Sequence, residues 1–361
     1  MMDGVHWQLY PASAFSEFER VWDEFNAATF QLPLLSAALM HTGLRHFGNG
    51  DEHLAIATDD RGTAALCLIR NRGAPQLTTF QPSQFPVGPW LQRSDLGLPA
   101  LAGSLLQHRS KRAALASVTQ LDPMFVPRPA DAALITSLGY ISTGTIDLPE
   151  SLDDYMATRS ENLLANLRRR EHKINREHGR IVLEVLEQPA EVARGIDIYS
   201  DLESAGWKGR LGTALGKGNV QWRFYQEALA SLAREGNARV YILRAGDELA
   251  AASFAIVAAH CVYLLKTTHN ERLRSIAPGM ILRSQFIQSL YEREAGVRRV
   301  EIYGALNDSQ RPWVTSTREM YSSNVYRGSA IGSLHALWRR MARPFRGNGE
   351  PQLTRRDRNR P

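Results

Sequence analysis

Six side chains in the second half of the sequence could act as a general acid or base: Glu203, His260, His269, Glu301, Tyr303 and Asp308. A group that takes a proton from an amine needs a pKa near the working pH, and burial is the usual means of reaching it. We expect Glu203, Glu301 and Tyr303 to be the catalytic residues. Glu203 stands beside an indole and a lysine, and the other two lie on the apolar, strand-like run "VEIYG". No Ser–His–Asp or Cys–His pattern stands out.

Residues 203–218, "ESAGWKGRLGTALGKG", combine glycines and cations around one tryptophan. They are not a Walker A loop, because Lys208 and Lys217 are each followed by glycine instead of the required Ser or Thr. A flexible surface linker would explain the glycines, but a bulky indole is uncommon in a solvated linker. We favour a loop that folds over the acceptor substrate of a reaction. The residues expected to contact that substrate are Trp207, Lys208, Arg210 and Thr213.

Two other segments could bind an anion. A predicted helix begins at Pro278–Gly279, where free N–H groups and the helix dipole suit a phosphate, although proline is also ordinary at a first helical position. Earlier in the chain, Arg169, Lys173 and Arg176 recur at i, i+4 and i+7, so one helix face could hold a phosphate-bearing group. The alternative is a solvated surface, since two glutamates partly offset these cations.

The net charge of +6 is concentrated at one end of the 361-residue chain. Residues 333–361 contain eight Arg, no Lys and two acidic residues, so this segment accounts for the whole excess and the rest is formally neutral. A neutral body argues against a broad nucleic-acid surface, and we expect no DNA partner. Residues 333–346 also predict a basic amphipathic helix. We favour its docking on the protein, with peripheral contact to the inner face of a membrane as the alternative.

The two cysteines, Cys67 and Cys261, lie in apolar runs and provide neither a zinc spacing nor a disulfide framework. We therefore expect no metal site. The N-terminus lacks the pattern of a signal peptide. No window reaches the roughly 18 apolar residues of a membrane span. Together these features predict a cytoplasmic protein.

The elements that must position these residues mix helices and strands in both halves of the chain. In the first half we expect helices at 14–25 and 131–139, a hairpin of strands 53–58 and 63–70, an irregular segment at 82–90, and strands at 114–121 and 141–149. In the second half we expect one broken helix or two at 151–180, further helices at 190–204, 220–236 and 277–296, and strands at 181–187, 238–244, 249–258, 261–269 and 297–304. We divide the chain into domains 1–149 and 150–332 and a tail, 333–361.

Several segments of the second half resemble one protein family in their amino-acid sequence and in their order along the chain. They include "LRRREHKINREHG", "SAGWKGRLGTAL", "SIAPGMIL" and "VEIYGALNDSQRPW". Over residues 145–327 the sequence resembles the Fem-like branch of GNAT acyltransferases, and within it the CelD-type group of cellulose-biosynthesis or biotin-operon-like acetyltransferases. The resemblance implies an α+β fold of two tandem GNAT-like domains, with mostly antiparallel sheets flanked by helices, of which the second carries the better-preserved acyl-donor site.

The resemblance also implies where the acyl donor binds. In GNAT proteins the donor's pyrophosphate sits at the loop and helix N-terminus that follow the fourth strand, which are residues 276–280 here. Of the usual Gln/Arg-x-x-Gly-x-Gly/Ala loop, "RSIAPGM" keeps Arg274 and Gly279 but lacks the other glycines. This departure leaves acyl-CoA, an acyl carrier protein and a charged tRNA open as donors. The residues expected on the donor side are Lys266, Arg274, Pro278, Gly279, Met280, Arg169, Lys173 and Arg311.

The resulting hypothesis is an N-acyltransferase that moves an acyl group from acyl-CoA or an acyl carrier protein, used as a co-substrate with no bound cofactor, onto an amine. The acceptor could be a small molecule, an amino sugar or a long-chain lipid of cell-envelope biosynthesis. Two alternatives stay open. One is a Fem-type ligase that uses aminoacyl-tRNA, which would need a basic surface near Gly279. The other is a non-catalytic accessory protein of envelope polysaccharide assembly.

Overall fold

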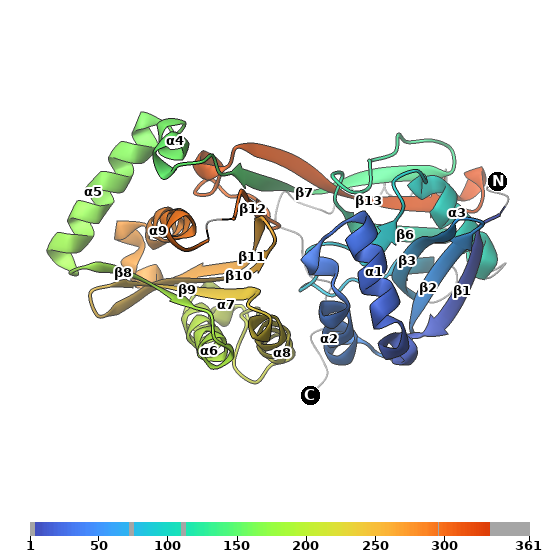
Figure 1. Ribbon diagram of the computed structural model, residues 1–361, viewed down its shortest axis with the longest axis horizontal. Coiled ribbons are helices and arrows are strands. Elements are labelled where there is room, and N and C mark those ends of the chain that lie inside the picture. Colours follow the sequence, from blue (N-terminus) through green and yellow to red (C-terminus); the bar gives the residue numbers. More distant parts are fainter. Residues whose placement is uncertain (1–3, 72–75, 110–112, 295, 333–361) are drawn as a thin grey trace.

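A single sheet runs through both halves of the chain in the computed structural model, which describes residues 4–71, 76–109, 113–294 and 296–332 (Figure 1). The strand order is β1-β2-β3-β4-β6-β13-β7-β12-β11-β10-β9-β8, and β5 pairs with β3 outside this path. The first half contains β1 (His6–Pro11), η1 (Ala12–Phe18), α1 (Glu19–Thr29), η2 (Pro33–Leu35), α2 (Ala37–Phe47), β2 (Glu52–Asp59), β3 (Gly62–Asn71), β4 (Gln76–Thr79), β5 (Trp90–Gln92), α3 (Leu98–Arg109), β6 (Leu115–Leu121) and β7 (Ile135–Asp147).

The second half begins with two helices and ends on a long strand. Its elements are α4 (Leu152–Ala157), α5 (Glu161–Glu177), β8 (Ile181–Leu186), α6 (Pro189–Ala205), α7 (Trp207–Arg210), α8 (Val220–Arg234), β9 (Ala238–Ala245), β10 (Glu248–Ala258), β11 (Cys261–His269), η3 (Glu271–Ile276), α9 (Pro278–Arg293), β12 (Arg299–Ile302), η4 (Arg311–Trp313) and β13 (Ser316–Tyr326). The helices and strands expected between 151 and 304 are therefore confirmed. The tail, including the helix expected at 333–346, lies outside the described residues.

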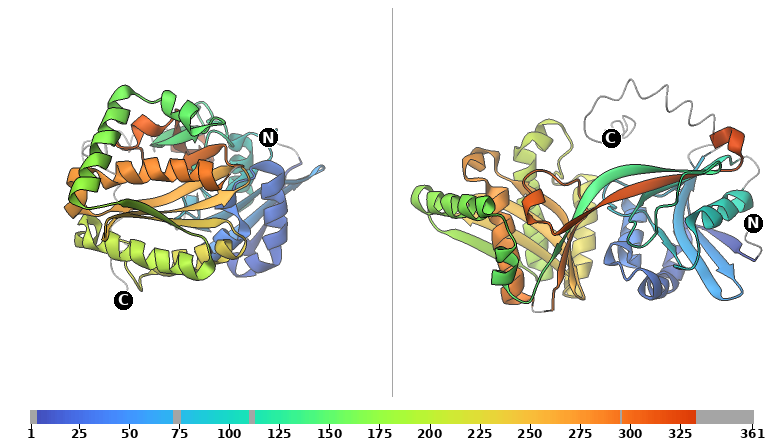
Figure 2. Two further views of the ribbon diagram at one scale, coloured as in Figure 1. Left: turned by 60° about the vertical axis from the view of Figure 1, so that its left-hand side comes forward. Right: turned by 90° about the horizontal axis from the view of Figure 1, so that it is seen from above.

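The two halves repeat one strand order and exchange their last strands. In each, antiparallel strands lead to one parallel pair, β4 with β6 in the first half and β11 with β12 in the second. Beside β6 lies β13 from the end of the second half, and beside β12 lies β7 from the end of the first. The strands β7 and β13 also pair with each other, and they form the long ribbon that joins the halves in Figure 2. The division expected at residue 149 remains a prediction, because the sheet runs continuously past it.

The helix expected at 131–139 is wrong, because this segment enters β7 at Ile135. Its apolar residues are spaced as in a helix, but residues 135–138 alternate between buried and half-buried as in a strand. Pairing of this segment with β13 overrides the local preference. Gly139 fits this pairing, since a Cβ there would lie 2.4 Å from an oxygen of Glu319 on β13. The strand β13 itself was not expected from the sequence.

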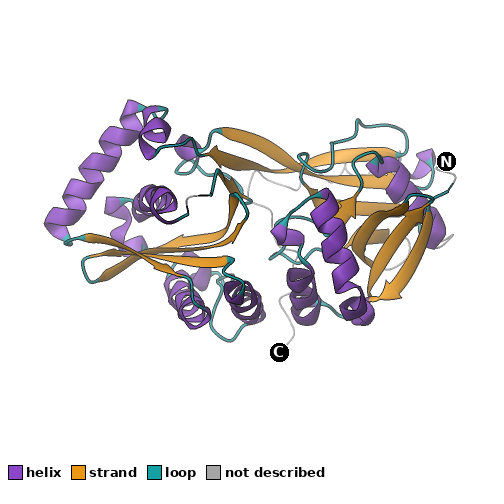
Figure 3. Cartoon of the chain, viewed as in Figure 1, coloured by secondary structure: helices purple, strands orange, loops and turns teal. Residues whose placement is uncertain are grey.

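Helices cover both faces of the second half's sheet (Figure 3). One face carries α4, α5 and α9, and the other carries α6, α7 and α8, as Figure 1 shows. The first half packs against the second through α2 and α8. At that contact Glu227 on α8 is paired with Arg45 and lies 2.9 Å from Nε2 of His46, both on α2. The halves are thus joined by a shared sheet and by a helix contact.

Because β7 and β13 belong to both halves, we expect urea to unfold the chain in one cooperative transition. Tryptophan fluorescence and far-UV circular dichroism should report the same midpoint. The variant Glu227→Gln, which weakens only the partly exposed contact between α2 and α8, should shift both midpoints together by the equivalent of about 1 kcal/mol or less. Two separate transitions, each reported by one probe, would contradict this description of the sheet.

Candidate functional site

Residues 203–218 form an ordered segment anchored by a buried carboxylate. Glu203, at the end of α6, is 2% exposed and accepts hydrogen bonds from the Lys208 ammonium at 2.6 Å, the Tyr199 hydroxyl at 2.9 Å and the Leu215 N–H at 2.7 Å. The segment also bonds to itself, since Thr213 donates its N–H to the carbonyl of Lys208 at 2.9 Å. The expectation of a folded loop is consistent with these contacts.

Two lysines determine the charge state of Glu203. Burial alone would raise the pKa of this carboxyl, but Lys266 and Lys208 outweigh burial and the pKa is lowered. Lys266 on β11 faces the same carboxylate, and its Nζ lies 5.7 Å from the ring centroid of Tyr225. Burial lowers the pKa of Lys266, and Glu203 opposes that change. Glu203 is therefore an ionised counter-ion between two cations, which suits it to hold the loop.

Glu271, the first residue of η3, fastens the loop to the end of β11. Its Oε1 accepts the N–H of Trp207 at 2.6 Å, and its Oε2 accepts from Nη2 of Arg210 at 2.9 Å. An open pocket of ≈ 420 Å³ lies here, lined by Leu202, Ala205, Gly206, Arg210, Asn270, Glu271 and Arg272. Trp207 is 45% exposed beside this pocket. The pocket thus combines apolar side chains with two arginines, Arg210 of α7 and Arg272 of η3.

The helix α9 opens at the far end of η3, as the sequence predicted. Its N-cap, Ala277, is left-handed with φ 51°, and Pro278 takes the first helical position. Gly279 faces open space, since no atom lies within 4 Å of a Cβ built there. Residues 271–276 (η3) therefore link the loop to the start of α9. Trp207 and Arg210 bond to the first residue of η3, and Gly279 lies three residues after its last.

The other cations expected on the donor side are spread more widely. On α5, Arg169 bonds to Asn166 and Lys173 lies 3.7 Å from Glu177 within the same helix. Their neighbour Arg170 donates to the carbonyl of Ser275, which brings α5 against η3. Arg311 lies on η4, more than half exposed, with Asp308 4.0 Å away. Arg274 is exposed on η3.

The strand β11 pairs with the short strand β12 only over its first four residues. They are parallel from Cys261 opposite Arg299 to Leu264 opposite Ile302. Beyond this point β11 continues to His269 along β10, while the chain after β12 turns to β7, where Leu306 donates its N–H to the carbonyl of Ser142. At the point of separation Leu265 is an extra residue in β11, because Phe254 faces Lys266 and Ala255 faces Leu264. A bulge thus stands where the two strands separate.

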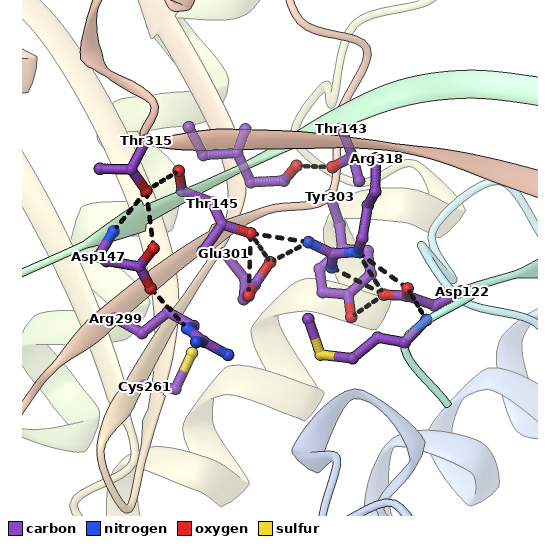
Figure 4. A network of polar contacts seen from close by, with 12 residues as sticks. Asp122, Thr143, Thr145, Asp147, Cys261, Arg299, Glu301, Tyr303, Thr315 and Arg318 are labelled. Atoms are coloured by element: carbon purple, nitrogen blue, oxygen red, sulfur yellow. Dashed lines mark hydrogen bonds and ion pairs between the residues drawn. The ribbon is translucent and has the colours of Figure 1, made fainter. Parts of the chain in front are cut away.

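A buried cluster of charged side chains lies at β12, on the other side of the opening between β11 and β12 (Figure 4). Arg318 on β13 donates from Nη1 to Oε2 of Glu301 on β12 at 2.7 Å, and from Nη2 to Oδ2 of Asp122 at 2.7 Å. Tyr303 donates its hydroxyl to the same oxygen of Asp122 at 2.7 Å. Thr145 on β7 donates to Glu301 and accepts from Arg318. The cluster therefore combines residues of both halves of the chain.

Glu301 and Tyr303 keep their protons more firmly than free side chains do. Burial raises the pKa of Glu301, and the opposing effect of Arg318 does not cancel it. Burial also raises the pKa of Tyr303 well above its usual value, with a further contribution from Asp122. The Tyr303 ring stacks on Tyr263 of β11, with centroids 6.4 Å apart and planes inclined by 20°. Of the carboxylates that we expected to be catalytic, Glu301 has the environment of a general base.

Sequence reasoning did not find Asp122, Arg318 or Glu271. Asp122 and Arg318 stand 196 positions apart, so no local spacing connects them. Glu271 follows the strand 261–269 directly, but its partner Arg210 is 61 positions away. Only the pairing of strands and the docking of the loop bring these residues together.

Part of the chain matches a family of known proteins. Residues 161–311 match the family model described as an acetyltransferase (GNAT) domain. The matched segment, which runs from the start of α5 to η4, is thus similar to a GNAT domain. None of the curated proteins matches the sequence.

Solved structures extend the similarity to the whole fold. The C-terminal domain of a protein assigned as a lysylphosphatidylglycerol synthetase from Agrobacterium fabrum is 16% identical, with a TM-score of 0.55 and coverage of 91% of this chain and 97% of that one. L-PGS from Bacillus licheniformis is 16% identical, with a TM-score of 0.51 and coverage of 89% and 96%. FemX is 10% identical, with a TM-score of 0.54 and coverage of 88% and 98%. The fold expected from the sequence, in which GNAT-like units occur in tandem, is confirmed.

Neither a metal-binding cluster nor a membrane-spanning helix occurs in the described part of the chain. No group of three or more His, Cys, Asp or Glu side chains there is placed to hold a metal ion. No helix within the same ranges is long and apolar enough to cross a membrane.

We expect Glu203→Gln to destabilise the protein by about 2–4 kcal/mol, because it leaves Lys208 and Lys266 without their buried counter-charge. Since the folded-state pKa of Glu203 is lowered, its contribution is present at neutral pH and is lost as the pH falls through the folded pKa. Urea titrations at a series of pH values measure both effects. Glu184→Gln, in a half-exposed pair with Arg244, is the control and should cost less than about 1 kcal/mol. Equal losses in the two variants would refute the anchoring role.

We expect Gly209→Ala to disrupt the loop, because its Cβ would lie 1.8 Å from the carbonyl oxygen of Ser204. The loss should be about 2 kcal/mol or more, as for an overpacked or strained position. Gly103 in α3 is the matched control, since a Cβ there meets no atom within 4 Å. Gly103→Ala should be neutral or stabilising by about 0.5–1 kcal/mol. If thermal unfolding showed no difference between the two variants, the backbone of the loop would not be packed as described.

Proposed function

We propose that this chain is an N-acyltransferase that moves an acyl group from acyl-CoA or an acyl carrier protein onto an amine. One observation carries the proposal. The strand β11 bulges at Leu265 and separates from β12 just before the chain enters η3 and α9. A thioester carbonyl lying in this opening could accept a hydrogen bond from a backbone N–H at the bulge, which would stabilise the developing oxyanion. The phosphates of the donor would lie at the start of α9, near Gly279.

The reaction requires a neutral amine. Its nitrogen attacks the thioester carbon, the C–S bond breaks, and the thiolate leaves as the new amide forms. The amine proton passes to a base, either directly or through a water molecule. We assign this role to Glu301, whose pKa is raised by burial, in preference to Glu203, whose pKa is lowered and whose carboxylate is already held by three donors.

Asp122 and Arg318 act as positioning residues for Glu301. Arg318 bonds to both carboxylates, and Asp122 also accepts the hydroxyl proton of Tyr303. Asp122 comes from the first half of the chain, so the proposed base is held in place only when both halves are present. The negative charge of Asp122 also contributes to the raised pKa of Glu301.

The pocket at the loop is the proposed acceptor site. Leu202 and Ala205 offer it apolar contact, and Arg210 and Arg272 offer positive charge. Such a site suits an amine whose remaining part carries an aliphatic segment and an anionic group. Trp207, exposed beside the pocket, would cover the aliphatic segment when the acceptor binds.

A second candidate function is transfer of an aminoacyl group from tRNA. Two observations favour it. Solved structures with a similar fold over nearly the whole chain include FemX and the C-terminal domain of a protein assigned as a lysylphosphatidylglycerol synthetase. The basic helix α5 also contacts η3 through Arg170, near the proposed donor site. This candidate predicts RNA binding that weakens steeply as salt is raised. Acyl-CoA transfer predicts no such binding.

A screen of donors against amines tests the proposal. The donors are acyl-CoAs of graded chain length, acyl carrier proteins and aminoacyl-tRNAs, and the signals are thiol release and amide formation. We expect release from at least one thioester in the presence of an amine that carries an anionic group. Transfer from aminoacyl-tRNA alone would favour the second candidate. No transfer from any donor would refute both and would leave a non-catalytic role.

In an active pair, we expect Glu301→Gln to lower kcat by about 10²–10⁴-fold, as for the loss of a general base. The variant should also lose stability, because Arg318 loses one of its two buried counter-charges. The wild-type rate should fall as the pH is lowered and Glu301 takes up its proton, with an acid limb above the usual range of a glutamate because its pKa is raised. Glu319→Gln, at an exposed site on β13, is the control and should keep the wild-type profile. An unchanged acid limb in Glu301→Gln would assign the base elsewhere.

A further inference from the structure

Arg283 on α9 is a buried cation without a counter-ion among the described residues. It is 6% exposed, and it makes no hydrogen bond or ion pair with any of them. Its guanidinium carbon lies 5.9 Å from the ring centroid of Phe286. Burial lowers its pKa to about 10, and the opposing influence comes from the Tyr155 hydroxyl, not from a carboxylate. Buried arginines are ordinarily paired, because removing a guanidinium from water is costly.

Two residues that interact with the same tyrosine also have unsatisfied donors. The indole Nε1 of Trp313 and the hydroxyl of Tyr291 are both buried without a hydrogen-bond partner. The hydroxyl of Tyr155 on α4 donates to the carbonyl of Trp313 at 2.7 Å, and Arg159 donates to the same carbonyl at 2.9 Å. Burial raises the pKa of Tyr155, and the charges of Arg159 and Arg283 oppose that change. We call this meeting point of α4, α9 and η4 the Tyr155 junction. It contains N–H and O–H donors that lack an acceptor, together with a cation that lacks an anion.

We propose that the Tyr155 junction is a binding subsite for an oxyanion, held by Arg283. A phosphate or carboxylate group would supply both the missing charge and the missing acceptors, and the planar guanidinium matches either one. Arg283 follows Gly279 by four residues, so both lie on nearly the same side of α9, one turn apart. The open start of the helix and the buried cation are therefore one turn apart on α9.

This inference does not depend on the proposed acyl transfer, and it concerns a residue that the proposed mechanism does not use. The cost of burying Arg283 without a partner is expected where a residue is kept for a ligand instead of for stability. The 6% exposure that remains means that an anion can touch the guanidinium. The two possible ligand groups, phosphate and carboxylate, are distinguished by the test.

The test compares the full chain with Arg283→Met and Arg283→Lys, and with Arg293→Met as the control. Arg293 lies on the same helix but is half-exposed and paired with Glu187. Thermal unfolding is followed without additive, with inorganic pyrophosphate and with succinate, all at one ionic strength. Calorimetry then gives the affinity for whichever anion raises the Tm.

Without an anion, we expect Arg283→Met to unfold at the same temperature as the wild type or higher, because methionine replaces a buried unpaired charge. One anion should raise the Tm of the wild type and of Arg293→Met. The affinity of the protein for this anion should fall about tenfold or more in Arg283→Met. It should fall less in Arg283→Lys, which keeps the positive charge but loses the paired N–H donors of the guanidinium. The anion that acts identifies the group as phosphate or carboxylate.

Three results would overturn the inference. A large drop in the Tm of Arg283→Met without anion would show that the arginine is satisfied within the fold. An equal response of Arg283→Met and the wild type would place the anion elsewhere. The absence of any response to either anion in the wild type would leave no ligand for the junction. Failure of acyl transfer would not affect these measurements, so the two proposals are refuted separately.

Discussion

The contact between Arg318 and two buried carboxylates is the constraint on which the rest of the site depends. Asp122 and Glu301 are almost fully buried, and Arg318 is the cation that bonds to both of them. The three residues come from β13, β12 and the segment after β6, so they meet only when the halves exchange strands. Removing one partner of such a cluster leaves an uncompensated charge in the interior, which costs several kcal/mol. The same contact therefore couples assembly of the sheet to the geometry of the site.

The opening between β11 and β12 follows from this arrangement. With β12 held between β7 and β11, and Glu301 and Tyr303 held by the cluster, the chain beyond β12 is directed towards β7. β11 continues alone along β10 and leads, through η3, to the loop on one side and to α9 on the other. Glu271 and Glu203 hold the loop at this end of the sheet. The donor and acceptor sites that we propose are thus neighbours because one strand leaves its partner.

The sequence allowed the elements with local signals to be predicted, but not the contacts between segments that are far apart in the chain. The meander of β9, β10 and β11 and the helix α9 were expected at nearly their observed bounds, because alternation, turn residues and a proline at the helix start are local signals. Asp122 and Arg318 were missed, since β13 gives no strong local signal and its partners lie far away in the chain. The helix expected at 131–139 failed for the same reason, because pairing with β13 determines that segment. Glycines such as Gly209, which seemed suited to a flexible loop, are needed for close packing.

The central claim is that the cluster formed by both halves tunes Glu301 as the base of acyl transfer. The most direct test is the pH dependence of kcat for Asp122→Asn beside the wild type, with one active donor and acceptor. Loss of the negative charge of Asp122 should lower the pKa of Glu301, because that charge helps to raise it. We expect the acid limb of the profile to move to lower pH in a variant that remains folded. An acid limb at the wild-type position would contradict it.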